Sequence, residues 1–274
     1  MKVTLIEPRG FCFGVCRALQ MLDALIEKQP VVLHQIVHNK QIIQKYIEQG
    51  VRFVENLDDL AEGTELVLSA HGVSYFIETY AKNHFKVTDT TCPFVARIHS
   101  WVEKLEHQNL PIVLIGKPGH AEVKGILGRL KNPDNAFVVS DVAGVGLLPQ
   151  MPEIGVAMQT TLSVDETKDI IFALKQKFKT VHLQNGICQA TTQRQEAVKQ
   201  AAKTHKMILV VGDKNSSNAL RLVEVANANG AQGILIETLK DLENIAFPDK
   251  VAITAAASAP ESLVLDIFEY LKKQ

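Results

Sequence analysis

The sequence of 274 residues has no long hydrophobic run and no excess of charge of either sign. No apolar stretch approaches the roughly 18 to 20 residues that cross a membrane, and Glu7 and Arg9 interrupt the N-terminal apolar residues before a secretory signal could form. Lys and Arg number 29 against 30 Asp and Glu, so the positive charge that drives nucleic-acid binding is lacking. We therefore expect a cytoplasmic protein that binds neither membranes nor nucleic acids.

Cysteines and glycine-rich phosphate loops are also scarce. The four cysteines are too few and too dispersed for the disulfide framework of a secreted protein, and no Cys-x-x-Cys pair indicates a structural zinc site. Neither G-x-x-x-x-G-K-[ST] nor G-x-G-x-x-G occurs, so nucleotide cofactors are unsupported. The thiols are expected to be free or to bind metal.

What is present is a regular alternation of short apolar or β-branched runs with segments of helical periodicity. This pattern is typical of parallel sheets flanked by helices. The expected strands are 3–6, 31–37, 51–54, 65–69, 85–88, 111–115, 136–139, 154–158, 179–183, 207–211, 232–236 and 250–254. The expected helices lie near 14–28, 40–49, 75–83, 94–107, 121–130, 164–177, 191–204, 217–228 and 260–272, with capping boxes at 163–166 and 258–261.

Three of the cysteines occupy the same place in this pattern, after a strand and before a helix. They are Cys12, Cys92 and Cys188, 80 and 96 residues apart, and each interval holds a similar series of elements. The sequence therefore predicts three α/β units with parallel sheets, arranged as a pseudo-threefold trefoil around a common centre. These units are residues 12–91, 92–187 and 188–274, the third completed by the strand within residues 1–11. The alternative is one larger doubly wound sheet with coincidental cysteine spacing.

Three thiolates around an axis suit a cuboidal iron–sulfur cluster with one iron left open. A single buried cysteine, in contrast, is more often an inert packing residue. Cys16 lies four residues after Cys12 on the same expected helix, so spacing alone leaves it as a competing ligand. The simpler interpretation is that Cys16 packs beside Leu19.

Loops after the first and third strand of each predicted unit are rich in small and hydrogen-bonding residues. Ligands bind beyond the carboxyl ends of parallel strands, and these side chains could donate to the oxygens of a diphosphate. They are His38, His71 and His120, then Ser216, Ser217 and Asn218 at a helix start, and Ser258. For the serines and Asn218 the simpler interpretation is helix N-capping.

Glu122 is a carboxylate in one of these loops. His120 and Glu122 match half of a zinc deaminase signature, but the required P-C-x-x-C is absent. If Glu122 lies near a cluster and a bound anion and is shielded from water, its pKa should be raised. A raised pKa is what a general acid requires. The alternative is an exposed first-turn glutamate favoured by the helix dipole.

Nine motifs in collinear order from Pro8 to Pro260 carry a resemblance. The motifs are PRGFCFGV (8–15), VHN (37–39), SAHGVS (69–74), DTTCP (89–93), GHAEV (119–123), QTTLS (159–163), ICQATT (187–192), KNSSN (214–218) and ASAP (257–260). By these motifs the sequence resembles the family of 4-hydroxy-3-methylbut-2-enyl diphosphate reductases, which act last in the methylerythritol phosphate route to isoprenoids.

The resemblance implies a trefoil of three α/β domains around one [4Fe–4S] cluster per chain, with one iron not bound by protein. It implies a reductive dehydroxylation that removes the allylic hydroxyl and yields isopentenyl and dimethylallyl diphosphate. Electrons would come from an external donor of ferredoxin or flavodoxin type. The implied cluster ligands are Cys12, Cys92 and Cys188, and the implied diphosphate ligands are His38, His71, His120, Ser216, Ser217, Asn218 and Ser258. Glu122 would deliver protons with His120 and Thr160 as further catalytic residues, and Thr160 and Thr191 would orient the substrate.

Two residues depart from the family pattern. Ala256 stands where the family usually has glycine, and Cys16 occupies a position that the family does not use as a ligand. Two other protein classes compete with this interpretation. One is a non-catalytic iron–sulfur protein, which has no need of the histidine- and serine-lined pocket. The other is a zinc-dependent phosphoester hydrolase, which would favour carboxylate and histidine ligands.

Overall fold

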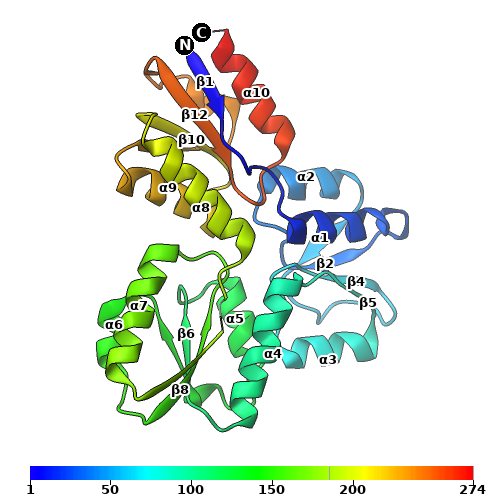
Figure 1. Cartoon of the computed structure of the whole chain (residues 1–274). Coiled ribbons are helices and arrows are strands. Elements are labelled where there is room, and N and C mark those ends of the chain that lie inside the picture. The colour runs from blue at the N-terminus through cyan, green and yellow to red at the C-terminus, as the bar shows by residue number, and fades with distance from the viewer. Residues whose placement is uncertain (185, 274) are drawn as a thin grey trace. The chain divides into compact units, whose positions relative to one another are not determined.

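The computed structural model describes residues 1–184 and 186–273 and contains three four-stranded sheets (Figure 1). Gln274, the last residue of the third predicted unit, lies outside the described residues. The strands are β1 (Lys2–Leu5), β2 (Val31–Leu33), β3 (Arg52–Val54), β4 (Glu65–Leu68), β5 (Lys86–Asp89), β6 (Ile112–Ile115), β7 (Ala136–Val139), β8 (Glu153–Met158), β9 (Thr180–Leu183), β10 (Met207–Val211), β11 (Gln232–Ile236) and β12 (Lys250–Ala255).

The α-helices connect or flank these strands, as expected for parallel sheets. They are α1 (Phe13–Asp23), α2 (Lys40–Glu48), α3 (Tyr75–His84), α4 (Pro93–His107), α5 (Ala121–Leu127), α6 (Val142–Leu147), α7 (Val164–Lys177), α8 (Gln189–Ala202), α9 (Ser217–Ala228) and α10 (Glu261–Lys272). Short 3₁₀ turns cover Ile26–Lys28, Pro133–Asn135 and Leu239–Leu242.

The three sheets share one topology. Their orders are β3-β2-β4-β5, β7-β6-β8-β9 and β11-β10-β12-β1, with parallel pairing in each. In the third sheet the N-terminal strand β1 takes the fourth position, with Val3 opposite Val251 of β12. This pairing confirms the prediction that the first strand of the chain completes the last sheet. The alternative of a single larger doubly wound sheet is wrong.

All twelve expected strands are present, but some expected boundaries are wrong. The run 31–37 ends as a strand at Leu33 because His34 has a φ of 60°, in the left-handed region that no strand continues. The expected helix 14–28 ends at Asp23 and is followed by a 3₁₀ turn. Helix α6 was not expected, since Gly144 and Gly146 lower its intrinsic helix propensity.

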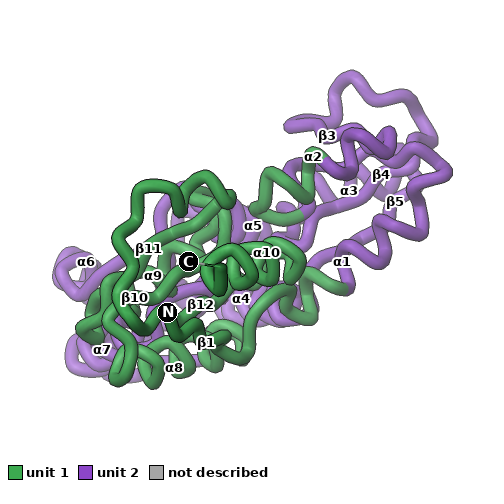
Figure 2. Tube along the Cα trace, turned by 90° about the horizontal axis from the view of Figure 1, so that it is seen from above, with its two compact units in different colours: residues 1–16, 37–44, 188–274 green, residues 17–36, 45–187 purple. Residues whose placement is uncertain are grey.

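The chain forms two compact units, coloured separately in Figure 2. Unit 1 consists of Met1–Cys16, Val37–Gln44 and Cys188–Gln274 and contains the sheet β11-β10-β12-β1. Unit 2 consists of Arg17–Ile36 and Lys45–Ile187 and contains the other two sheets. The boundaries at 91/92 and 187/188, and the threefold arrangement of the three sheets, stay predictions.

Each sheet has apolar side chains packed against the helices that cover it. Strand β10 is buried along its whole length, and Leu222, Ile253 and Ile267 pack in the same core of unit 1. In unit 2, Val102 and Ile126 on helices pack with Leu114 of β6. These cores hold the strand ends, and the loops that follow them, in place.

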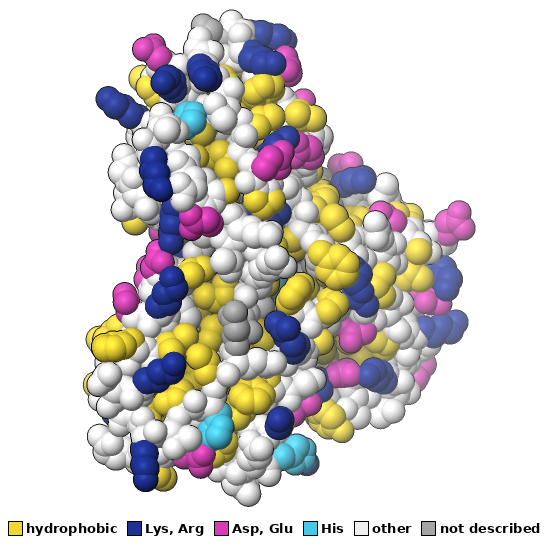
Figure 3. All heavy atoms as spheres, viewed as in Figure 1, with side chains coloured by type: hydrophobic (Ala, Val, Ile, Leu, Met, Phe, Trp, Pro, Cys, Tyr) yellow, Lys and Arg dark blue, Asp and Glu magenta, His cyan; other side chains and the backbone are white. Residues whose placement is uncertain are grey.

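Charges of both signs are interspersed on the face of the molecule shown in Figure 3. This agrees with the near balance of 29 basic and 30 acidic residues. Among residues 1–184 and 186–273, no helix is both long and apolar enough to cross a membrane.

Candidate functional site

The candidate residues lie at equivalent points of the three sheets. Across each sheet, the strands lie in the order second, first, third, fourth along the chain. The first and third strands are therefore neighbours, and the connections that follow them run in opposite directions. Open α/β sheets bind ligands at the carboxyl ends of two such strands. These neighbours are β2 and β4, β6 and β8, and β10 and β12. The loops singled out from the sequence follow these six strands.

In unit 2, the β6 and β8 loops meet at Glu122. Thr160 donates to its carboxylate twice, from the backbone N–H to Oε1 at 2.7 Å and from Oγ1 to Oε2 at 2.9 Å. Glu122 is only 2 % exposed, so the alternative of an exposed first-turn residue is wrong. Burial raises the pKa of Glu122 to about 7, although the two hydrogen bonds from Thr160 act in the opposite direction. A carboxyl with that pKa can hold or release a proton near neutrality.

His120 caps the helix on which Glu122 lies. The His120 Nδ1 accepts the backbone N–H of Glu122 at 3.1 Å, so in the neutral ring the proton is on Nε2. The adjoining Gln159 bridges the same two loops, since its Oε1 accepts the N–H of Lys117 at 3.0 Å. Sequence reasoning left Gln159 out of the candidate site, although it lies in the quoted motif 159–163.

The loop that carries His71 is packed tightly against helices α4 and α5. A Cβ placed on Gly72 would lie 2.5 Å from Cε1 of His99, and one placed on Gly125 would lie 3.5 Å from the carbonyl oxygen of His71. Cys92 donates its N–H to the carbonyl of Ala70 at 3.0 Å. The backbone on either side of His71 is therefore held by its neighbours.

We expect Gly72→Ala to destabilise the protein more than an ordinary glycine substitution. Gly72 has a φ of +74°, which costs alanine about 1–2 kcal/mol, and the contact with His99 adds about 1–3 kcal/mol of overpacking. Gly63 is a matched control, because its φ is +75° and a Cβ there meets nothing within 4 Å. Urea denaturation of both variants measures the difference. Equal losses of unfolding free energy would show that His99 does not restrict this position.

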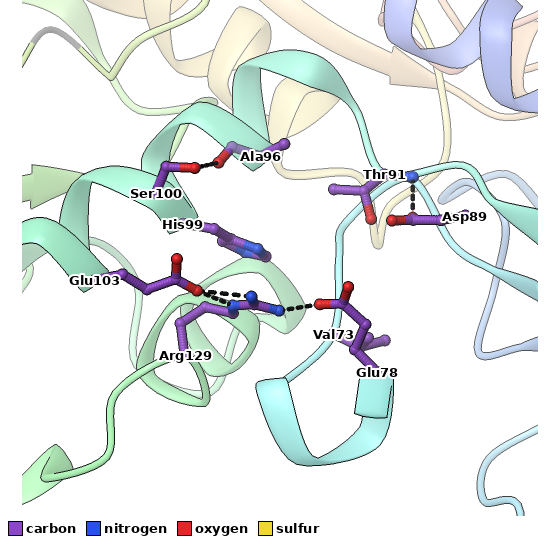
Figure 4. Close-up of a pocket in the computed structure, with 9 residues that line it drawn as sticks. All are labelled: Val73, Glu78, Asp89, Thr91, Ala96, His99, Ser100, Glu103 and Arg129. Atoms are coloured by element: carbon purple, nitrogen blue, oxygen red, sulfur yellow. Dashed lines mark hydrogen bonds and ion pairs between the residues drawn. The ribbon is translucent and has the colours of Figure 1, made fainter. Parts of the chain in front are cut away.

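Arg129 ties together the helices around this loop. Its guanidinium pairs with Glu78 of α3 and donates to Glu103 of α4, with Nε 2.7 Å from Oε1 (Figure 4). These three residues, with His99, line a pocket of about 160 Å³. Burial, together with the nearby Arg129, lowers the pKa of His99 to about 4, so His99 is neutral at pH 7. The ion pairs of Arg129 hold the segment that follows α5 against α3 and α4.

In unit 1, one residue connects a cysteine to a predicted anion-binding residue. Ala257 accepts the N–H of Cys12 at 3.1 Å through its carbonyl and donates its own N–H to Oδ1 of Asn218 at 3.0 Å. The Nδ2 of Asn218 is buried and has no hydrogen-bond partner among the described residues. The Cys12 bond to Ala257 repeats the Cys92 bond to Ala70, which supports the equivalence of the two cysteines.

Ser258 and His38 also lie together in unit 1. The Ser258 Oγ donates to the carbonyl of His38 at 3.1 Å, and burial lowers the pKa of the His38 imidazole. The predicted capping box at 258–261 is therefore wrong, because Ser258 is used in this longer-range contact and α10 starts after Pro260. Ser216, in contrast, does cap α9, since its Oγ accepts the N–H of Ala219 at 3.3 Å.

All four cysteines are free thiols, and three of them begin helices. Cys92 and Cys188 are the N-caps of α4 and α8, and Cys12 accepts the N–H of Cys16 in the first turn of α1. The Cys188 Sγ also lies 3.1 Å from Oγ1 of Thr191. Such positions favour negative charge because the helix dipole is positive at its N-terminus.

The four cysteines are divided between the two units. Cys12, Cys16 and Cys188 belong to unit 1 and Cys92 to unit 2. Within the described parts of the chain, no three His, Cys, Asp or Glu side chains are grouped for one metal ion. The choice of Cys12, Cys92 and Cys188 over Cys16 as ligands stays a prediction.

Sequence reasoning missed Arg194 altogether. This residue is 3 % exposed and lies on the buried face of α8 with Thr191 and Val198. The sequence does contain a signal for this burial. Arg194 lies three residues after Thr191 and four before Val198, a spacing that places all three on one face of a helix.

Comparison with known proteins decides the family. The model of the family described as LytB protein matches residues 3–272. The chain belongs to the LytB family. LytB relatives include the 4-hydroxy-3-methylbut-2-enyl diphosphate reductase of Mannheimia succiniciproducens, 40 % identical over 289 residues that cover 100 % of this chain and 90 % of the relative. The reductase of the same name from Wolbachia pipientis is 41 % identical over 284 residues, covering 99 % of this chain and 92 % of the relative.

Solved structures agree with this membership. The E-1-hydroxy-2-methyl-but-2-enyl-4-diphosphate reductase of Plasmodium falciparum superposes with a TM-score of 0.91 at 33 % identity, over 99 % of this chain and 88 % of that one. A second structure, of (E)-4-hydroxy-3-methyl-but-2-enyl diphosphate reductase, has a TM-score of 0.72 at 29 % identity over 100 % of both chains. The LytB fold is thus shared over the full length.

Proposed function

We propose that the protein is a reductase that converts 4-hydroxy-3-methylbut-2-enyl diphosphate to isopentenyl and dimethylallyl diphosphate. The observation that carries this proposal is the end-to-end identity of 40 % with reductases of that name. In this reaction two electrons and two protons enter, the allylic C–O bond breaks, a C–H bond forms and the hydroxyl leaves as water. It is the last step of the methylerythritol phosphate pathway, and we propose that it takes place in the cytoplasm.

We further propose that Cys12, Cys92 and Cys188 bind one [4Fe–4S] cluster, leaving one iron without a protein ligand. Three free thiols, each at the start of a helix, fit a soft and anionic group of this kind. When bound, the cluster supplies electrons and a Lewis-acidic iron. An external donor of ferredoxin or flavodoxin type would reduce it, since the sequence has no flavin or nicotinamide motif.

The protein's own residues would bind the diphosphate and move protons. The proposed diphosphate ligands are His38, His71, His120, Ser216, Ser217, Asn218 and Ser258. The buried Nδ2 of Asn218 is a donor that supports this assignment, because a buried donor without a partner is costly.

Glu122 would hold the proton that leaves with the hydroxyl, and Thr160 would fix the carboxyl through its two hydrogen bonds. Thr191 would orient the substrate together with Thr160, and His120 would assist in proton transfer.

Metal analysis after anaerobic purification tests the cluster. We expect brown protein with about four irons and four sulfides per chain. Colourless protein with stoichiometric zinc would contradict the proposal and favour a phosphoester hydrolase. Full cluster content without turnover of the substrate would favour a non-catalytic iron–sulfur protein.

A further inference from the structure

Arg194 is a buried charge that none of the proposed catalytic roles uses. Its side chain starts on α8, six residues after Cys188, and the residue is only 3 % exposed. Moving a guanidinium out of water costs several kcal/mol unless hydrogen bonds and an opposite charge compensate. Identifying these compensating groups therefore indicates what Arg194 does.

Two of the hydrogen bonds of Arg194 go to backbone carbonyls. Nη2 donates to the carbonyl of Gly10 at 2.7 Å, and Nη1 donates to that of Ala190 at 3.1 Å. Gly10 is two residues before Cys12, and Ala190 is two residues after Cys188. The planar guanidinium therefore joins the segments that carry two of the proposed cluster ligands.

The third guanidinium nitrogen of Arg194 has no partner in the part of the chain that the structure describes. Nε is buried and makes no hydrogen bond to any described residue. A buried N–H of this kind is rare in folded proteins, and its cost is removed when a ligand provides an acceptor. The sulfur atoms of an anionic cluster are acceptors of this type.

The acidic side chains that interact electrostatically with Arg194 are mainly thiols. They are Cys12, Cys188 and Cys16, followed by Glu7. The Glu7 side chain is 71 % exposed and pairs with Arg9, so it does not provide a buried counter-ion. A buried opposite charge for Arg194 would therefore come from the group that these cysteines bind.

We propose that Arg194 is a positioning residue of the metal site, which holds the Cys12 and Cys188 segments together and raises the reduction potential of the cluster. This inference rests on the proposed function. A fixed positive charge favours the more negative, reduced form of a nearby redox centre, and hydrogen bonds to cluster sulfur act in the same direction. Arg194 does not contact the substrate in this role.

Two substitutions distinguish the effect of the positive charge of Arg194 from the effect of its hydrogen bonds. Arg194→Gln removes the charge, and Arg194→Lys keeps it but loses the bidentate geometry. Arg221→Gln is the matched control, because Arg221 is also buried in unit 1 but pairs with Glu224 of its own helix. The holoproteins are purified anaerobically and titrated with dithionite and redox mediators, and the reduced cluster is followed by EPR.

We expect Arg194→Gln to shift the midpoint potential to a more negative value and Arg194→Lys to shift it less, whereas Arg221→Gln stays close to wild type. A wild-type potential in iron-replete Arg194→Gln would overturn the proposal. If Arg194→Gln does not fold, Arg194→Met decides, because it also lacks the charge: a potential more negative than wild type supports the proposal, and a wild-type potential contradicts it. A wild-type protein without any iron–sulfur cluster would instead refute the proposed function itself.

Discussion

Cys12→Ser, Cys92→Ser and Cys188→Ser are each expected to lose the cluster and with it turnover, whereas Cys16→Ser keeps both. A serine hydroxyl is a harder and far less acidic ligand than a thiol, so it holds iron poorly. Cys12 and Cys92 occupy matching positions, because each donates its N–H to the carbonyl of the second residue after the third strand of a sheet. Cys16 lies one turn into α1 and has no such bond.

Iron and sulfide per chain, together with the visible absorption spectrum, measure this outcome for all four variants under anaerobic conditions. Cys16→Ser is the internal control, since it removes one thiol without touching an equivalent position. Full iron content in any of the other three variants would remove that cysteine from the ligand set. Cluster loss in Cys16→Ser would make Cys16 a ligand.

Glu122→Gln is expected to lower kcat by about 10²- to 10⁴-fold, the usual range for removal of a general acid. The amide can keep both contacts with Thr160, because its oxygen accepts the backbone N–H and its nitrogen donates to the hydroxyl. Iron content and diphosphate affinity should therefore remain near wild type. Glu166→Gln, an exposed first-turn glutamate of α7, is the matched control and should leave kcat unchanged.

The kcat measurement should use a chemical reductant, so that docking of the physiological electron donor does not limit the rate. Wild-type turnover in iron-replete Glu122→Gln would refute the acid role and direct attention to His120 or to a water held by Thr160.

The same substitution should change the pH dependence of stability. The pKa of Glu122 is about 7 in the folded protein against 4.5 for an ordinary glutamate, so the folded state retains this proton while the unfolded state has lost it. The free energy of unfolding should then fall by about 3 kcal/mol as the pH rises from roughly 4.5 to 7. Glu122→Gln should lack this contribution, and urea denaturation across that pH range measures it. An identical slope in both proteins would show that the carboxyl is not held protonated.

Much of the fold was predictable because its elements have strong local signals. The run 207–211 is uniformly apolar and mostly β-branched, and it forms the fully buried β10. The pairing of β1 with β12 followed from the repeat, since the third series lacked a closing strand. Helix α6, which contains two glycines, had no comparable signal and depends on its Asp141 cap and on packing against α7.

The parts of the site that were missed depend on contacts between distant residues. Ser258 has the local pattern of a capping residue, but it bonds to His38, 220 residues away in the sequence. Arginine is usually a surface residue, and only the position of Arg194 on the buried side of α8 shows that this one is buried. The burial of Glu122 likewise depends on Thr160, 38 residues further along the chain.

Incubation of the reduced, iron-replete protein with 4-hydroxy-3-methylbut-2-enyl diphosphate under anaerobic conditions tests the proposed reaction most directly. Mass spectrometry of the products should show isopentenyl and dimethylallyl diphosphate, with one substrate consumed for every two electrons supplied. Unchanged substrate, or release of inorganic phosphate without loss of the allylic hydroxyl, would contradict the proposed reaction.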